Sequence, residues 1–171
     1  MVLNKAKSEE IVTLIRNGFF KDWGGFSDPR WIKEEDKYKR DKIEQAQSDA
    51  GISEAALRRL VAAGQYDEIT QRLKKLATNL LYLSKPSKGD LNILFQPQLD
   101  KSTFFQAFFD LLYGEGKTLD RLARYVQYIE AQDIPTEANK WTFPTYFLFL
   151  CHPDRELFIK PTAIQWFLDF I

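Results

Sequence analysis

The chain has 171 residues, with 24 basic and 24 acidic side chains, so its formal net charge is zero. This balance excludes a strong overall attraction to nucleic acid or anionic membranes, and the single cysteine, Cys151, excludes an internal disulfide framework. The 44% hydrophobic and 28% charged shares are those of a globular domain, while an aromatic share of 15%, with 14 Phe, predicts a core of large rings.

The N-terminal part of the chain predicts two helices of different character. The first follows Ser8, a candidate N-cap, and has apolar residues at helical spacing. The second begins at Pro29, behind Asp28 as its cap, and carries five basic and five acidic residues between positions 33 and 44. We therefore expect a charged helix over residues 29–50, which either lies solvated on the surface or projects as an arm that binds a partner.

Two further helices are predicted on either side of Gly64. The first has Ser53 as its N-cap, and the second runs from Tyr66 to about Leu83 with a clean apolar stripe. Residues 84–100 contain two prolines and one glycine, and we expect an irregular connection there.

The second half begins with a helix over residues 103–113 that is apolar on nearly every face. The next helix is predicted with Thr118 as its cap and an inner face formed by Leu119, Leu122, Ala123, Val126 and Ile129. A short aromatic helix over residues 144–151 follows, and a last helix is opened by Pro161.

These elements predict an all-α fold, because no segment shows sustained alternation with period two. We expect a single domain over residues 1–171: a compact bundle of about seven helices with an aromatic-rich core and at most one tiny hairpin. The N-terminus lacks the apolar region of a secretory signal, and the longest apolar stretch, residues 143–151, is about half of the ~20 residues that cross a bilayer. A cytoplasmic protein without membrane contact is therefore expected.

Two local patterns resemble catalytic motifs but fail on spacing. Residues 114–118, Gly-Glu-Gly-Lys-Thr, end like a phosphate-binding loop, yet Leu111 stands where that motif needs its first glycine. Cys151 and His152 are neighbours, and adjacent helical residues point about 100° apart, so we expect a buried thiol and a capping or loop histidine. No catalytic residue, metal site or cofactor is predicted, and the chain is not expected to be an enzyme.

The best polar candidate is a group of cations on two predicted helices. These residues could bind phosphates, although ordinary solvated helix faces would look the same: Arg58, Arg59, Arg72, Lys74 and Lys75. Nucleic-acid binding is therefore the alternative function.

The C-terminal residues are the candidate partner-binding site. Trp166, Phe167 and Phe170 belong to an aromatic run that reaches Ile171 without a helix stop signal. This pattern favours a piece of a longer polypeptide, whose exposed aromatic residues would contact another protein or a downstream domain. The leading hypothesis is thus a non-catalytic helical interaction module, an accessory domain of a larger protein or assembly.

One segment also suggests a family. Lys140 to Leu150 (KWTFPTYFLFL), then Pro153 to Arg155 (PDR) and Phe158 to Thr162 (FIKPT), resemble the helical region upstream of the AAA+ ATPase module in McrB-like restriction and phage-defence proteins. The resemblance contains no catalytic motif and carries over no site residue. It implies an accessory segment of a nucleic-acid-directed machine, so the alternative function is the nucleic-acid-binding domain of a restriction or defence system.

Overall fold

The computed structural model describes residues 5–18, 28–33, 37–77, 89–132, 138–161 and 164–165. Contacts divide the chain into two units: residues 1–41 with 162–171, and residues 42–161. The described residues form helices and their connections and contain no strand, which confirms the all-α class. The single domain over the whole chain stays a prediction.

The first unit contains the helices α1 (Lys5–Gly18) and α2 (Pro29–Trp31), and α3 (Lys37–Gln47) begins in it. Asp28 caps α2 as predicted: its Oδ1 accepts the backbone N–H of Arg30 at 2.8 Å. The charged helix expected over residues 29–50 is therefore represented by α2 and α3, while residues 34–36 lie outside the described part of the chain.

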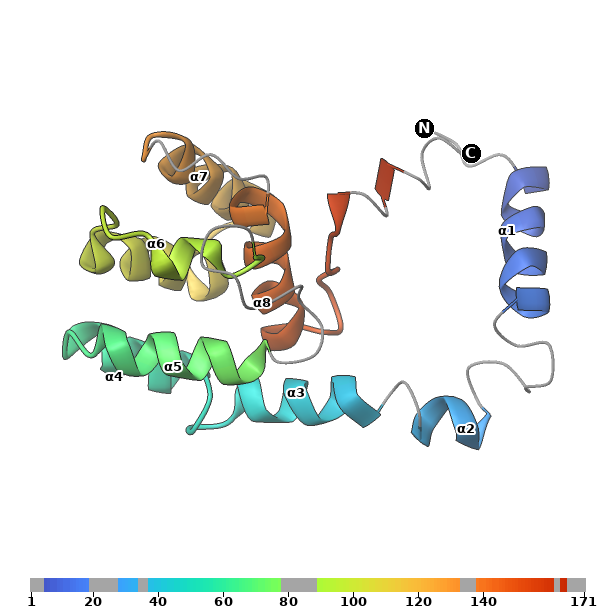
Figure 1. The fold of residues 1–171 in the computed structure, drawn as a ribbon, viewed down its shortest axis with the longest axis horizontal. Coiled ribbons are helices and arrows are strands. Elements are labelled where there is room, and N and C mark those ends of the chain that lie inside the picture. The colour runs from blue at the N-terminus through green and yellow to red at the C-terminus, as the bar shows by residue number, and fades with distance from the viewer. Residues whose placement is uncertain are drawn as a thin grey trace. The chain divides into compact units, whose positions relative to one another are not determined.

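The second unit is a helical bundle around α6 (Figure 1). Its elements are α4 (Glu54–Ala62), α5 (Tyr66–Leu76), the 3-10 helix η3 (Asn92–Phe95), α6 (Lys101–Tyr113), α7 (Thr118–Glu130), the π-helical segment η4 (Ala138–Thr142) and α8 (Phe143–Cys151). Helix α6 packs against α4, α5, α7 and α8, and six of its apolar side chains are buried in these contacts.

Local signals account for several helix boundaries in this unit. Ser53 caps α4 by accepting the N–H of Ala56, and Gly64, with φ of +67°, turns the chain into α5. The helix predicted from residue 103 starts earlier, because the carboxylate of Asp100 accepts the N–H of Thr103 and caps α6. The prediction that Thr118 caps α7 is wrong, and its hydroxyl instead donates to Glu156 Oε1 at 2.7 Å.

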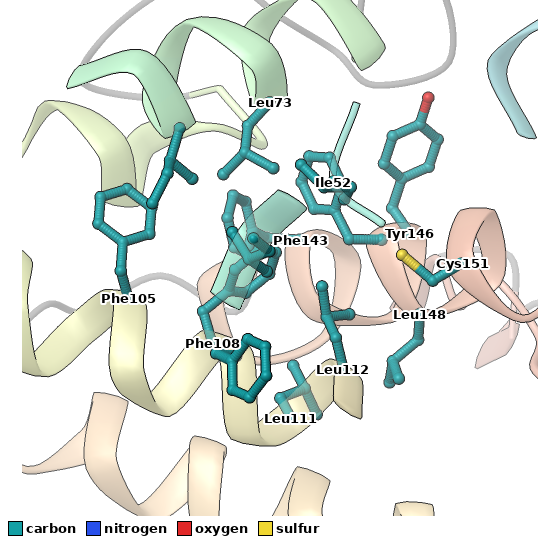
Figure 2. Packing of buried hydrophobic residues seen from close by; sticks show 14 of the residues in the cluster. Ile52, Leu73, Phe105, Phe108, Leu111, Leu112, Phe143, Tyr146, Leu148 and Cys151 are labelled. Atoms are coloured by element: carbon teal, nitrogen blue, oxygen red, sulfur yellow. The ribbon is translucent and has the colours of Figure 1, made fainter. Parts of the chain in front are cut away.

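The core of this unit is built from aromatic rings, as the composition predicts (Figure 2). The Phe108 ring of α6 lies 5.5 Å from that of Phe143 and 5.6 Å edge-on from that of Phe147, both on α8. Tyr146 is also buried, and its hydroxyl donates to the carbonyl of Leu76 at 2.7 Å. Edge-on and tilted ring pairs are the favourable arrangements, so these rings stabilise the packing of α6 against α8.

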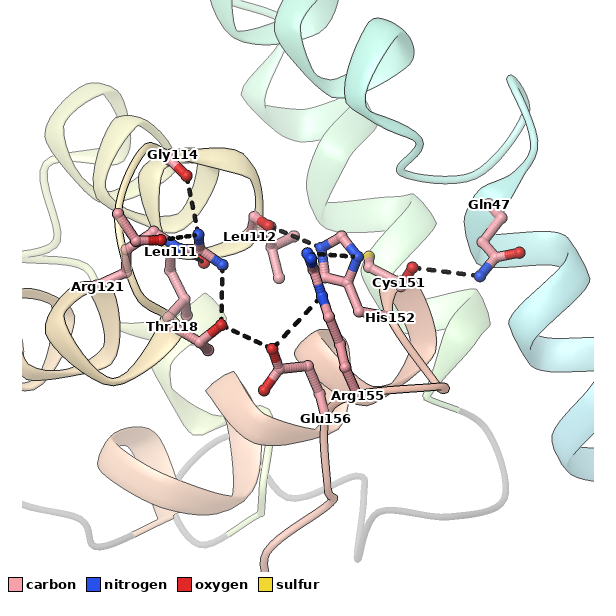
Figure 3. Close-up of polar contacts among 11 residues, drawn as sticks. Gln47, Leu111, Leu112, Gly114, Thr118, Arg121, Cys151, His152, Arg155 and Glu156 are labelled. Atoms are coloured by element: carbon pink, nitrogen blue, oxygen red, sulfur yellow. Dashed lines mark hydrogen bonds and ion pairs between the residues drawn. The ribbon is translucent and has the colours of Figure 1, made fainter.

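The end of α3 packs into the second unit. Ala46 is fully buried, and Lys42 Nζ donates to the carbonyl of Lys75 at 2.7 Å. Gln47 Nε2 donates to the carbonyl of Cys151 at 3.2 Å (Figure 3). The last turns of the predicted charged helix are thus part of a packed body, and a projecting arm stays a prediction for residues 29–41.

Some expected elements cannot be compared with the structure. Residues 78–88, which include the end of the helix predicted to Leu83 and the start of the connection over residues 84–100, lie outside the described residues. Within the described part of the chain, no helix is both long enough and apolar enough to cross a bilayer.

Candidate functional site

Helix α7 carries two apolar faces. One of them consists of Leu122, Tyr125 and Ile129, which are buried. The predicted inner face was wrong in part, because Leu119 and Ala123 are exposed and Val126 is only half-buried. A helix that needed a single apolar face for its fold would leave these positions polar. Val126 packs against the core, so it is the exposure of Leu119 and Ala123 that the core of this unit does not explain.

The outer face lines a hollow, which we call the α7 hollow. Its volume is about 280 Å³, and its described lining residues are Leu119, Leu122, Ala123, Val126, Gln127, Glu130 and Trp141. Trp141 comes from η4, and its side chain is 36% exposed, while Leu119 is 74% exposed. Two large apolar side chains thus remain open to solvent around a lining that is mostly apolar.

The size and chemistry of the α7 hollow limit what it can hold. Sites for small molecules and cofactors have volumes of roughly 300–1,000 Å³ and several convergent polar groups. The α7 hollow lies at the lower limit of this range, and the side chains of Gln127 and Glu130 are the polar part of its described lining. It is better matched to one or two anchoring side chains of a protein partner.

Acids and cations are balanced beside the α7 hollow. Glu130 at its edge is paired with Lys140, with Nζ 3.3 Å from Oε1. Arg124, on the far side of α7, is held by Asp110 of α6 at 2.8 Å. Arg124 and Lys140 are therefore neutralised by acids, whereas Asp120 and Lys117, both exposed, form no ion pair within the described residues.

A buried arginine positions the start of α7 (Figure 3). The side chain of Arg121 is only 5% exposed, and its guanidinium donates to the carbonyls of Leu111, Gly114 and Gly116 at 2.9–3.0 Å. A phosphate-binding loop turns backbone N–H groups toward its ligand, whereas this turn directs carbonyls at a cation. The motif-like segment before α7 is thus a structural turn, as its spacing predicts.

The only histidine, His152, follows α8 and takes part in a series of polar contacts with α6 and with Arg155. His152 Nε2 lies 2.8 Å from the carbonyl of Leu112, and because a carbonyl only accepts, Nε2 carries the hydrogen. Nδ1 then accepts from Arg155 at 3.2 Å, and Arg155 Nε lies 3.7 Å from Glu156 (Figure 3). Both ring nitrogens of His152 therefore have a polar partner within the protein.

Cys151 is buried, as expected from the sequence. Burial raises the pKa of its thiol to about 12, which a hydrogen bond with Tyr113 offsets only in part. The thiolate is the nucleophilic form of cysteine, so this side chain is held in its unreactive state at neutral pH. Cys151 and His152 therefore lie side by side as structural residues.

The five predicted phosphate-binding cations are largely occupied by acids and rings of the protein. Arg58 pairs with Glu54 at 2.6 Å and lies over the Phe109 ring. Lys74 lies over the Phe95 ring, with Nζ 4.4 Å from the centroid. Since these two cations cover rings on different elements, they do not share a single phosphate-binding stripe.

Arg59 and Arg72 are the two predicted cations that the structure brings together. They line an open hollow of about 580 Å³ beside the turn between α4 and α5. Arg72, 16% exposed, pairs with Glu68 and donates to the carbonyls of Asp49 and Gly51, so it serves the turn after α3. Asp67 and Glu68 line the same hollow, which reduces its attraction for phosphate. Phosphate binding here, and by Lys75, which is exposed on α5, stays a prediction.

The predicted partner-binding residues Trp166, Phe167 and Phe170 lie outside the described residues. The structure instead reveals Leu119 and Trp141, which the sequence interpretation did not select. The spacing of Leu119 fits the single inner face predicted for this helix, so periodicity gave no signal of its exposure. Trp141 gave no such signal, because a Trp beside an aromatic helix looks like any other core residue.

Comparisons with known proteins do not assign the chain to a family. No family model, no curated protein and no solved structure matches it. The resemblance of residues 140–162 to McrB-like proteins therefore stays a prediction.

Proposed function

We propose that this chain is a non-catalytic helical interaction module that binds another protein through the α7 hollow. The observation that carries the proposal is the exposure of Leu119 and Trp141 around a mostly apolar depression. Contiguous apolar surface on a folded protein is typical of binding sites, and aromatic side chains are frequent anchors at their centres.

The second unit already has a well-buried core without Leu119, and this supports the proposal energetically. Its core already contains large side chains at 0–1% exposure from α4, α5, α6, α7 and α8. Leu119 adds nothing to this core, yet a partner that covered it would gain roughly 1.5–3 kcal/mol from one leucine side chain. An apolar face that the core does not use, on a helix held rigidly by Arg121, suits a preformed docking surface.

The test is site-specific photo-crosslinking in cells that produce the chain naturally. A benzophenone amino acid is placed at position 119 or, as a matched control, at position 157. Leu157 is also an exposed leucine, at 80%, but it does not line the α7 hollow. We expect a discrete adduct with another polypeptide from position 119 and little or none from position 157.

The pattern of adducts decides the outcome. Equal adduct yields at both positions would indicate nonspecific capture and would contradict the proposal. The absence of an adduct at position 119 in the folded chain would contradict it as well.

A further inference from the structure

We draw no further inference here: the strongest candidate, the exposed apolar face of α7 beside Trp141, belongs to the site already described, and nothing in the structure shows what covers it.

Discussion

Helices α6 and α7 are neighbours of the same length, yet they use their apolar residues differently. On α6, six apolar side chains are buried, including Phe104, Phe105 and Phe108. On α7, Tyr125 and Ile129 are buried, Leu119 is exposed at the α7 hollow, and Leu122 is buried between the two. The contrast separates two roles that look identical in a sequence: apolar residues that form the fold, and apolar residues available to a partner.

The largest expected effect belongs to the interior of α6. Phe108→Ala removes a ring that is fully buried among Phe104, Phe143 and Phe147, and should lower the free energy of unfolding by about 3–5 kcal/mol. Chemical denaturation measures this loss. A loss below about 1 kcal/mol would mean that α6 is not the centre of the unit. Phe108→Leu, which retains most of the apolar volume, is the control and should lose less.

The next effect concerns the buried side of α7. Arg121→Met should cost about 2–3 kcal/mol, because the carbonyls of Leu111, Gly114 and Gly116, the first of them buried, lose their donor. Arg124→Met, three residues along the same helix, removes only a half-exposed pair with Asp110 and should cost about 0.2–1 kcal/mol. Equal losses of unfolding free energy in the two variants would contradict the role of Arg121 in positioning α7.

A smaller effect is expected at the cations of α4 and α5. Because Arg58, Arg59 and Arg72 lie beside acids, double-stranded DNA should bind no more tightly than about 10⁻⁴ M at physiological salt. Fluorescence anisotropy with labelled duplexes measures this affinity. Tighter binding that the double variant Lys74→Glu/Lys75→Glu abolishes, and that falls steeply with salt, would favour the nucleic-acid alternative. The control is the double variant Lys117→Glu/Lys160→Glu, which changes the net charge by the same amount at other positions.

The sequence predicted many features that depend on near neighbours, although Ser8 lies inside α1 and does not cap it. Caps such as Ser53 and Asp28 act within three residues, and the aromatic core follows from helices that are apolar on most faces. The all-α class could be predicted for the same reason.

The features that were missed depend on distant contacts. Thr118 looked like a cap, but its hydroxyl bonds Glu156, which is 38 residues away. Arg121 gave no signal in the sequence, because only the turn that buries it distinguishes it from a surface cation. The exposed side of α7 could not be predicted, because periodicity marks an apolar face without stating what covers it. The candidate site was for this reason beyond the sequence, while its helix was not.

The most direct measurement compares the unfolding free energy of Leu119→Gln with that of Leu157→Gln. The account requires that the α7 hollow is left uncovered by the chain itself, so both variants should unfold within about 0.5 kcal/mol of the wild type. A loss of 2 kcal/mol or more in Leu119→Gln alone, roughly the worth of a buried leucine, would contradict the account. It would mean that Leu119 serves the fold and is not available to a partner.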